Sequence, residues 1–211
     1  MTPPYDAVQR LARQAMRVRG SAAGALPPLI ALTDPARTPD AAGYAAGLEP
    51  GSGLIYRHFG ADDRFETGRA LASIARERGL VLLVSADPEL ADAIGAAGLH
   101  WPETRLAQAF ARRCRGDRRP FTSAAHSPLA LARARASGVD AALFSPVFPS
   151  ASPSAGRAKG LWAAAAAARR AALPVYALGG VNTQTAARLE NLGFSGIACV
   201  GAIRSAGPTR T

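Results

Sequence analysis

Residues able to do acid–base chemistry stand at the ends of short apolar runs of this sequence. His126 ends the run 120–126, and Arg57 and His58 lie near the end of the run 53–59. An imidazole takes up and returns a proton near neutral pH, and a guanidinium binds a carboxylate or phosphate through paired hydrogen bonds. We therefore predict that His126 is catalytic and that Arg57 and His58 contact the substrate. The alternatives are structural: a helix cap for His126 and a polar rim residue for His58.

Glycines at the ends of two later runs could bind an anion. Gly179 and Gly180 follow one run directly, and Val200 and Gly201 lie within the last one. Glycine lets the backbone approach a ligand closely, and free N–H groups at such turns bind phosphate. The sequence thus predicts phosphate binding at these four residues, the alternative being that the glycines only make tight turns.

Two serines could also reach a ligand. Ser145 and Ser150 flank the end of the run 141–148, within a Ser-, Pro- and Gly-rich segment at 145–160. We predict substrate contacts for both, although serine and proline are also common in ordinary loops. The segment itself is predicted to be a loop over the mouth of an active site.

Eight apolar runs separated by helical patterns must position these residues. The runs are 28–35, 53–59, 80–86, 98–101, 120–126, 141–148, 174–180 and 196–203. Several are apolar throughout, which is typical of strands buried on both faces. The pattern predicts an α/β fold, a single (β/α)₈ TIM barrel with an extra N-terminal helix. An open doubly wound sheet is the alternative, but the first run lacks the glycine fingerprint of that fold.

The barrel brings the ends of all strands to one face, where active sites of such barrels lie. We expect residues 1–27 to form the N-terminal helix and lead-in, 28–204 the barrel, and 205–211 a short tail. His100, inside the short run 98–101, is expected to be a core histidine with its hydrogen bonds satisfied. Trp101 is expected to be a packing residue, the alternative being that it stacks on a heteroaromatic ring.

Helix starts follow several runs. Asp87 and Ser127 are each followed by proline, a pattern typical of a capping residue and the first helical position. The stretch 182–193 repeats it with Asn182 or Thr183 as the cap, and predicts another helix.

Composition limits the classes of partner. The 211 residues carry a net charge of +10, almost all of it from arginine, since Lys159 is the only lysine. The densest basic stretch, 111–120, has no interleaved aromatics for base stacking, so we predict no nucleic-acid partner.

Cys114 and Cys199 are far apart and fit free thiols in a reducing compartment. No run approaches the roughly 20 apolar residues of a membrane span, and no secretory signal is evident. The protein is predicted to be cytoplasmic, without a membrane partner, and homo-oligomerisation is left open.

Several stretches, taken together, resemble the thiamine phosphate synthase/TenI family. They are S-x-x-H-S at 123–127, ALFSPVFPS at 142–150 and ALGG at 177–180, in this order. The resemblance runs over about residues 28 to 204. It implies a barrel of thiamine biosynthesis whose partner is a small phosphorylated thiazole-type ligand.

The sequence departs from the family's synthase pattern where that pattern binds Mg²⁺ and diphosphate. The resemblance implies two metal-binding aspartates, and their positions here hold Ala86 and Arg105. The second strand keeps Arg57 but lacks the family's glutamine and lysine, and the T-x-T-K motif after Ser150 is replaced. We therefore expect no cofactor, with Mg²⁺ required only if the protein is a synthase.

The candidate site residues that the sequence keeps, His126 above all, are those expected in the TenI branch of the family. There, a histidine at the position of His126 carries the proton in a metal-independent thiazole tautomerase, which is an isomerase. The resemblance thus implies this activity for the present chain. Two alternatives stay open: a divergent thiamine phosphate synthase, a transferase joining a pyrimidine diphosphate to a thiazole phosphate, and a non-catalytic protein that binds a phosphorylated ligand.

Overall fold

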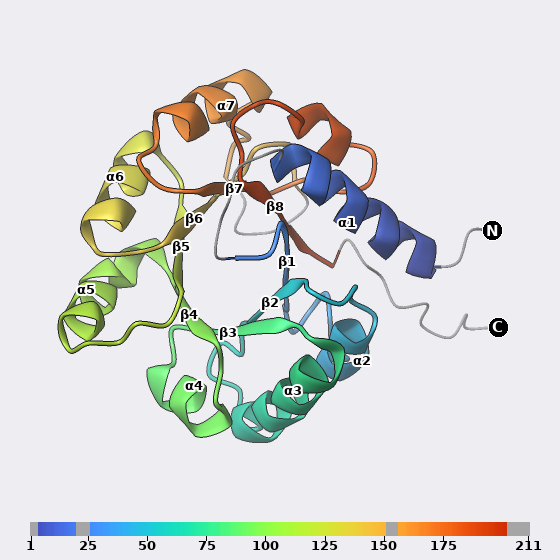
Figure 1. Cartoon of the computed structure of the whole chain (residues 1–211), viewed down its shortest axis with the longest axis vertical. Coiled ribbons are helices and arrows are strands. Elements are labelled where there is room, and N and C mark those ends of the chain that lie inside the picture. The colour runs from blue at the N-terminus through green and yellow to red at the C-terminus, as the bar shows by residue number, and fades with distance from the viewer. Residues whose placement is uncertain (1–3, 20–25, 151–155, 202–211) are drawn as a thin grey trace.

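Eight parallel strands form a closed barrel in the computed structural model, which describes residues 4–19, 26–150 and 156–201. Each strand pairs with its neighbours in chain order, and β8 closes on β1 (Figure 1). The strands are β1 (Leu29–Leu32), β2 (Gly53–Tyr56), β3 (Val81–Ser85), β4 (Gly98–Trp101), β5 (Phe121–Ala125), β6 (Ala141–Phe144), β7 (Val175–Ala177) and β8 (Gly196–Val200). All eight lie within the apolar runs. The predicted barrel is confirmed and the open sheet is wrong.

Helices cover the outside of the barrel (Figure 1). They are α1 (Pro4–Arg19), α2 (Ala41–Ala46), α3 (Arg64–Arg78), α4 (Pro88–Ile94), α5 (Leu106–Cys114), α6 (Pro128–Ala136) and α7 (Leu161–Arg170), with 3₁₀ turns η1 (Glu103–Arg105) and η2 (Ala186–Leu189). The predicted caps are present, because Asp87 accepts from the N–H of Leu90 at 2.9 Å and Ser127 from that of Ala130 at 3.1 Å. Each cap fixes where its helix begins, and so the length of the loop before it.

Helix α1 lies outside the barrel beside β8 and β1 (Figure 1). Its buried face consists of Val8, Leu11, Ala15 and Val18. Gln14 also ties it to the loop after β7 by donating to the carbonyl of Thr183 at 3.0 Å. The predicted N-terminal helix is therefore confirmed as part of the outer layer. The predicted tail, 205–211, and the lead-in at 20–25 lie outside the described residues.

The predicted helix over 182–193 is wrong, since only the short turn η2 forms there. Asn182 Oδ1 accepts from the N–H of Thr185 at 3.0 Å, and the Thr185 hydroxyl donates to the carbonyl of Gly180 at 2.8 Å. These bonds hold the segment in a turn, and extended backbone at Glu190 (ψ 136°) ends it. Helix α1, which contacts η2, covers this part of the barrel instead.

Apolar side chains form one core inside the barrel and another outside it. The inner core includes Ile30, Leu32, Ile55, Leu83, Leu143 and Tyr176. The outer core lies against the helices and includes Leu54, Leu99, Phe121, Phe144 and Ile197. Burial on both faces explains why the runs are continuously apolar. The inner core fills the barrel up to Leu32, above which a cavity opens.

Much of the basic stretch 111–120 is bound in an ion-pair cluster rather than left as free charge. Asp117 accepts from Arg112 Nε at 2.8 Å and from Arg119 Nη2 at 2.6 Å, and its side chain is 11% exposed. Hydrogen bonds from Arg119, followed by those from Arg112, outweigh burial and hold the pKa of Asp117 far below its usual value. Arg112 and Arg119 also both contact Asp92.

We expect Asp117→Asn to destabilise the protein by about 1 to 3 kcal/mol at neutral pH, because charge-assisted hydrogen bonds are lost. A carboxyl whose pKa is lowered on folding stabilises the fold above its unfolded pKa, and this contribution disappears as pH falls through the folded value. The difference in free energy of unfolding between wild type and variant should therefore become smaller below about pH 4. Urea unfolding at a series of pH values measures it, and a gap independent of pH would contradict the assignment.

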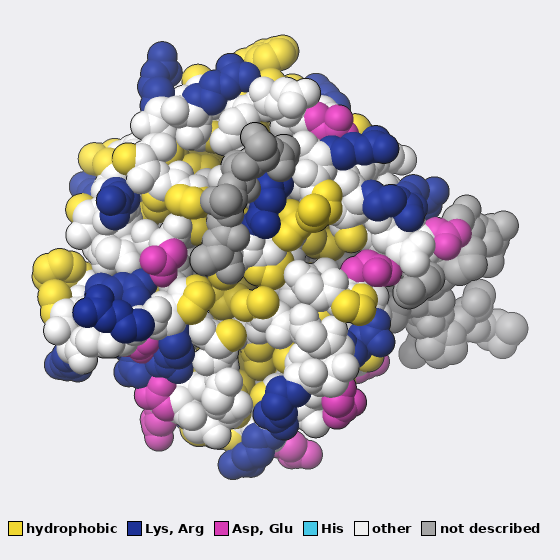
Figure 2. All heavy atoms as spheres, viewed as in Figure 1, with side chains coloured by type: hydrophobic (Ala, Val, Ile, Leu, Met, Phe, Trp, Pro, Cys, Tyr) yellow, Lys and Arg dark blue, Asp and Glu magenta, His cyan; other side chains and the backbone are white. Residues whose placement is uncertain are grey.

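On the face shown in Figure 2, Lys and Arg side chains lie in separate groups, most of them near the outer edge, with acidic side chains between some of these groups. The absence of a nucleic-acid partner stays a prediction. No helix in the described ranges has the length and apolar character needed to cross a membrane. Cys114 is exposed and Cys199 buried, and both are free thiols as predicted.

Candidate functional site

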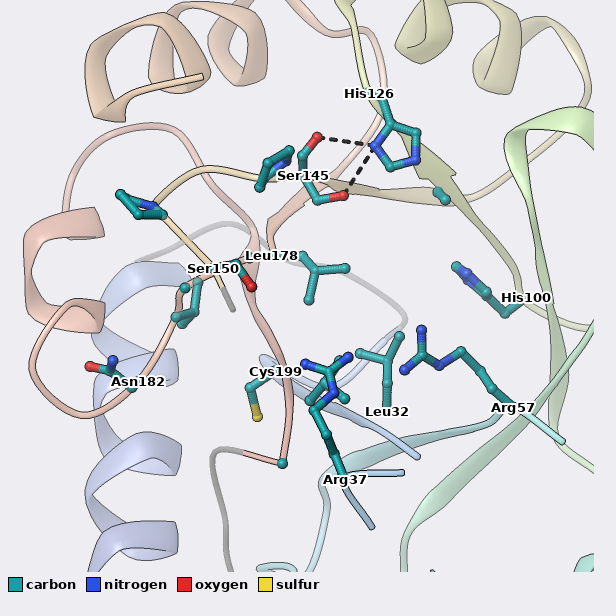
Figure 3. Close-up of a pocket in the computed structure, with 18 residues that line it drawn as sticks. Leu32, Arg37, Arg57, His100, His126, Ser145, Ser150, Leu178, Asn182 and Cys199 are labelled. Carbon is teal, nitrogen blue, oxygen red and sulfur yellow. Dashed lines mark hydrogen bonds between the residues drawn. The ribbon is translucent and has the colours of Figure 1, made fainter. Parts of the chain in front are cut away.

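A cavity of about 480 Å³ opens at the carboxyl ends of the strands (Figure 3). Eight of the nine residues predicted for the site line it: Arg57, His126, Ser145, Ser150, Gly179, Gly180, Val200 and Gly201. Each follows or ends a strand, so the barrel brings together residues far apart in the chain. Their ligand-binding and catalytic roles stay predictions.

His126 follows β5, and its imidazole is held by the first residue after β6. Nδ1 lies 3.1 Å from the carbonyl oxygen of Ser145 and 3.3 Å from its hydroxyl (Figure 3). A carbonyl only accepts hydrogen bonds, so the contact with the Ser145 carbonyl favours the tautomer of the neutral ring in which Nδ1 carries the proton and Nε2 has the lone pair. Ser127, not His126, caps helix α6. The geometry thus leaves one basic nitrogen of His126 for chemistry.

The backbone at His126 is fixed as well. Its N–H donates to Glu103 Oε2 at 3.2 Å, from the turn η1 after β4. With ring and backbone both held, little conformational freedom remains to be lost when a ligand binds.

Arg57 enters the cavity from the end of β2. Its Nε donates to the carbonyl of Thr33 at 2.7 Å, and its Nη2 to Asp34 Oδ2 at 3.2 Å, both in the loop after β1. Burial lowers the pKa of Arg57, and the charge of Asp34 acts against that shift. Nη1 has no hydrogen-bond partner among the described residues. The guanidinium is therefore oriented by β1 and keeps donors for a ligand.

Arg37 also lines the cavity, a position that sequence reasoning missed. It belongs to the same loop and pairs with Asp34 at 3.3 Å. Burial favours the neutral form of Asp34, but hydrogen bonding from Arg37 and the charges of Arg37 and Arg57 outweigh it, so the pKa of Asp34 is lowered. Among the described residues, one carboxylate thus accompanies two guanidinium groups on this side of the cavity. Arg37 could have been predicted as a cavity residue, because it is a charged residue in a loop that follows a barrel strand.

Cys199, on β8, forms part of the cavity wall. Burial raises the pKa of its thiol to about 12, and the neighbouring Tyr44 side chain acts in the opposite direction. The thiol is therefore protonated at neutral pH and is a poor nucleophile.

His58 is the predicted residue that does not line the cavity. Its Nε2 lies 3.3 Å from Asp87 Oδ2, and Arg64 Nε lies 3.3 Å from the same oxygen. Burial lowers the pKa of His58; Asp87 acts against this shift, whereas Arg64 adds to it. His58 does not line this cavity, as expected for the alternative of a polar rim residue, and its substrate contact stays a prediction. Side chains alternate along β2, so one of two adjacent residues faces the barrel interior.

Gly179 and Gly180 have a packing role that the sequence did not reveal. A Cβ on Gly179 would lie 2.7 Å from Cα of Pro146, and one on Gly180 would lie 2.4 Å from the carbonyl oxygen of Pro149. The N–H of Phe148 also donates to the carbonyl of Gly179 at 3.0 Å. These glycines therefore let the chain after β6 lie directly against the loop after β7. A phosphate role would come in addition to this packing.

The cavity holds a second histidine, His100 on β4, which was expected to be a core residue. It is 5% exposed, and burial, followed by the charge of Arg57, lowers its pKa to about 3. His100 is therefore neutral. Trp101, by contrast, is buried as expected and packs edge-on against Phe121.

The two positions that the resemblance assigns to metal ligands lie side by side. Arg105 Nη1 donates to the carbonyl of Ala86 at 3.0 Å, placing a cation where two carboxylates would be expected. The nearby Asp87 caps α4 and pairs with Arg64, while Glu103 accepts from the backbone of His126. In the described part of the chain, no three His, Cys, Asp or Glu residues are grouped for metal binding. These residues do not fit a Mg²⁺ site.

Proteins of known sequence that resemble this chain are named thiamine-phosphate synthases. One from Methylococcus capsulatus is 35% identical over 68% of this chain and 64% of its own length. One from Marinobacter nauticus is 31% identical over 87% of this chain and 85% of its own. The chain spans slightly less than two thirds of the length of two of these relatives.

Solved structures with this fold include enzymes with different names. The thiamine phosphate pyrophosphorylase from Pyrococcus furiosus has a TM-score of 0.70 at 21% identity, covering 82% of this chain and 84% of that one. A 2-keto-3-deoxy-6-phosphogluconate aldolase of Zymomonas mobilis has a TM-score of 0.59 at 16% identity, covering 95% and 90%. At such identities the likeness concerns the fold alone.

A family model settles the membership. The model described as thiamine monophosphate synthase (TMP-TENI) matches residues 46–203, well over half of the chain. The match includes the loops after β2, β5, β6, β7 and β8, from which most of the cavity is built. The resemblance inferred from the motifs is therefore confirmed, and this TIM barrel belongs to the thiamine monophosphate synthase/TenI family of thiamine biosynthesis.

Proposed function

We propose that the cavity binds a phosphorylated thiazole and isomerises it by proton transfer, as a TenI-type thiazole tautomerase. The observation that carries this proposal is the state of His126, whose Nδ1 is held by the Ser145 carbonyl while Nε2 is left as a base. The proposed reaction needs one base that also returns the proton, and it needs no metal.

In the proposed step, His126 Nε2 takes a proton from one carbon of the non-aromatic thiazole carboxylate phosphate. The imidazolium that forms keeps its bond from Nδ1 to Ser145, so it can return the proton to the carbon that is joined to the ring by an exocyclic double bond, and that double bond moves into the ring. The ring becomes aromatic and the imidazole ends neutral. A positioned base of this kind contributes about a hundred-fold to ten-thousand-fold in rate.

Anion binding in this proposal is divided between two sides of the cavity. Arg57, oriented by Thr33 and Asp34, would bind the carboxylate. The loops with Gly179, Gly180 and Gly201 would bind the phosphate through backbone N–H groups. A ligand spanning the cavity would then lie between Arg57 and the glycine loops, with its ring near His126.

Replacing Arg57 by glutamine should weaken binding of the thiazole carboxylate phosphate by about ten-fold to a hundred-fold, since hydrogen bonds to a charged group are lost. Binding of the thiazole phosphate that lacks the carboxylate should change much less. Arg64→Gln is the matched control, because Arg64 pairs with an aspartate at a similar distance but does not line the cavity. Calorimetric titration of both ligands measures this. Equal losses for the two ligands would contradict the role of Arg57.

A second candidate is the joining of a pyrimidine diphosphate to a thiazole phosphate, and the names of the relatives favour it. Expulsion of diphosphate requires strong neutralisation of the leaving group. The guanidinium of Arg105, bound to Ala86, stands where the family pattern has metal-binding carboxylates. This difference is why we rank proton transfer first.

One incubation series tests the proposal. The protein is mixed with the thiazole carboxylate phosphate tautomer alone, and in parallel with thiazole phosphate, pyrimidine diphosphate and Mg²⁺. Aromatisation in the first mixture without added metal is the expected result. Formation of thiamine phosphate in the second, with no aromatisation in the first, would overturn the proposal in favour of the synthase. Tight binding without either product would identify a non-catalytic binding protein.

A further inference from the structure

His100 is a buried polar side chain that faces the cavity and has no part in the proton transfer described above. It lies on β4, and Figure 3 shows its ring directed toward the space between His126 and Arg57. At 5% exposure it is enclosed by protein on every side except that of the cavity. A buried histidine of this kind requires a hydrogen-bond partner for each ring nitrogen.

Among the residues that the structure describes, one of its two nitrogens has such a partner. Nδ1 lies 2.9 Å from the hydroxyl of Thr122, the residue that pairs with His100 across β4 and β5. Thr122 is fully buried, so no water competes for this bond. Nε2 has no hydrogen-bond partner in the described ranges of the chain. The register of the two strands thus fixes the ring with Nε2 toward the cavity.

The charge state of His100 limits what it can bind. Burial and the neighbouring Arg57 guanidinium keep the imidazole neutral at physiological pH, so it offers no charge to a phosphate or carboxylate. The Thr122 hydroxyl can donate to Nδ1 or accept from it, which leaves Nε2 as donor or acceptor respectively. A neutral nitrogen that faces the cavity is suited to an uncharged polar atom of the ligand.

We propose that His100 is a specificity-determining residue, whose Nε2 hydrogen-bonds an uncharged polar atom of the ligand beside the anion bound by Arg57. The ring nitrogen of a thiazole is such an atom, and this choice of ligand rests on the proposed function. His126 then moves the proton, Arg57 binds the anion and His100 selects for the ring. A ligand lacking the polar atom would leave Nε2 buried without a partner, which costs binding.

Two substitutions separate this role from a structural one. His100→Gln keeps an amide near the position of Nε2 but loses the group at Nδ1, whereas His100→Asn keeps a group near Nδ1 and loses the one at Nε2. Thiazole phosphate and inorganic phosphate are titrated calorimetrically into wild type and both variants. Urea unfolding midpoints, together with Thr122→Val, measure the contribution of the bond to Thr122.

If His100 recognises the ring, His100→Asn should weaken thiazole phosphate binding by about ten-fold, while His100→Gln stays within about three-fold of wild type. Inorganic phosphate should bind all three proteins alike. Nitrogen NMR of wild type should show the His100 Nε2 signal shift on adding thiazole phosphate but not phosphate. The reverse order of the two variants, a parallel loss for both probes, or an unmoved Nε2 signal would overturn the proposal.

The proposed function could fail while this inference holds. If wild type binds inorganic phosphate but no thiazole phosphate, the function is wrong, and His100 is then tested with glycerol phosphate against ethyl phosphate. Wild type and His100→Gln should prefer the hydroxyl-bearing ester, and His100→Asn should lose that preference. Absence of any preference in wild type would overturn the inference as well.

Discussion

Replacing His126 by asparagine is expected to lower kcat for thiazole aromatisation by about a hundred-fold to ten-thousand-fold, the range of a lost general base. An asparagine amide can still donate to the Ser145 carbonyl, which His126 Nδ1 contacts at 3.1 Å. It has no basic nitrogen at the position of Nε2. The variant should therefore fold and bind thiazole phosphate within about three-fold of wild type, because only the proton carrier is lost. Single-turnover kinetics and calorimetry measure the two effects separately.

His58→Asn is the matched control for this experiment. His58 also follows a strand, but its Nε2 lies 3.3 Å from Asp87 Oδ2 and the residue does not line the cavity. We expect its turnover to stay within about three-fold of wild type. Wild-type turnover in His126→Asn would remove His126 from the mechanism. Equal losses of turnover in His126→Asn and His58→Asn would show that the effect is not specific to His126 as the base.

The fold could be read from the sequence because its determinants are local and repeated. Eight apolar runs and caps such as Asp87 and Ser127 recur at regular spacing, and each fixes one strand or one helix start. The helix predicted over 182–193 does not form, and the reason is also local. The side chains of Asn182 and Thr185 hold a turn that competes with a helix, and the covering role passes to α1 from the other end of the chain. The sequence pattern alone does not show that α1 takes the place of a helix at 182–193.

The site was predictable to the extent that strand ends determine it. His126, Ser145 and Gly179 all line the cavity because they follow strands whose carboxyl ends meet. His100 is buried as expected, but the sequence did not show that it also lines the cavity. Nor did it show that Arg57, rather than the adjacent His58, lines the cavity after β2. Both points depend on the direction of a side chain, which the residue types alone do not determine.

The role of Gly180 is the other point at which structure changes the interpretation, and a pair of alanine variants tests it. Gly180 has φ +64° and Gly95 has φ +65°, so alanine would adopt the same left-handed conformation at both. At Gly95 nothing lies within 4 Å of the added Cβ, whereas at Gly180 the carbonyl oxygen of Pro149 lies at 2.4 Å and Cβ of Phe148 at 2.7 Å. The two positions differ in packing but not in backbone strain.

Gly95→Ala should therefore lower the free energy of unfolding by about 1 to 2 kcal/mol, the cost of the left-handed conformation. Gly180→Ala should lower it by about 3 kcal/mol or more, because the chain after β6 must also move away from the loop after β7. That movement would displace Ser145, which holds His126, so turnover should fall together with stability. Urea unfolding and single-turnover rates measure both. Equal destabilisation of the two variants would mean that Gly180 serves the turn alone, and that the glycine pair has no part in assembling the catalytic histidine.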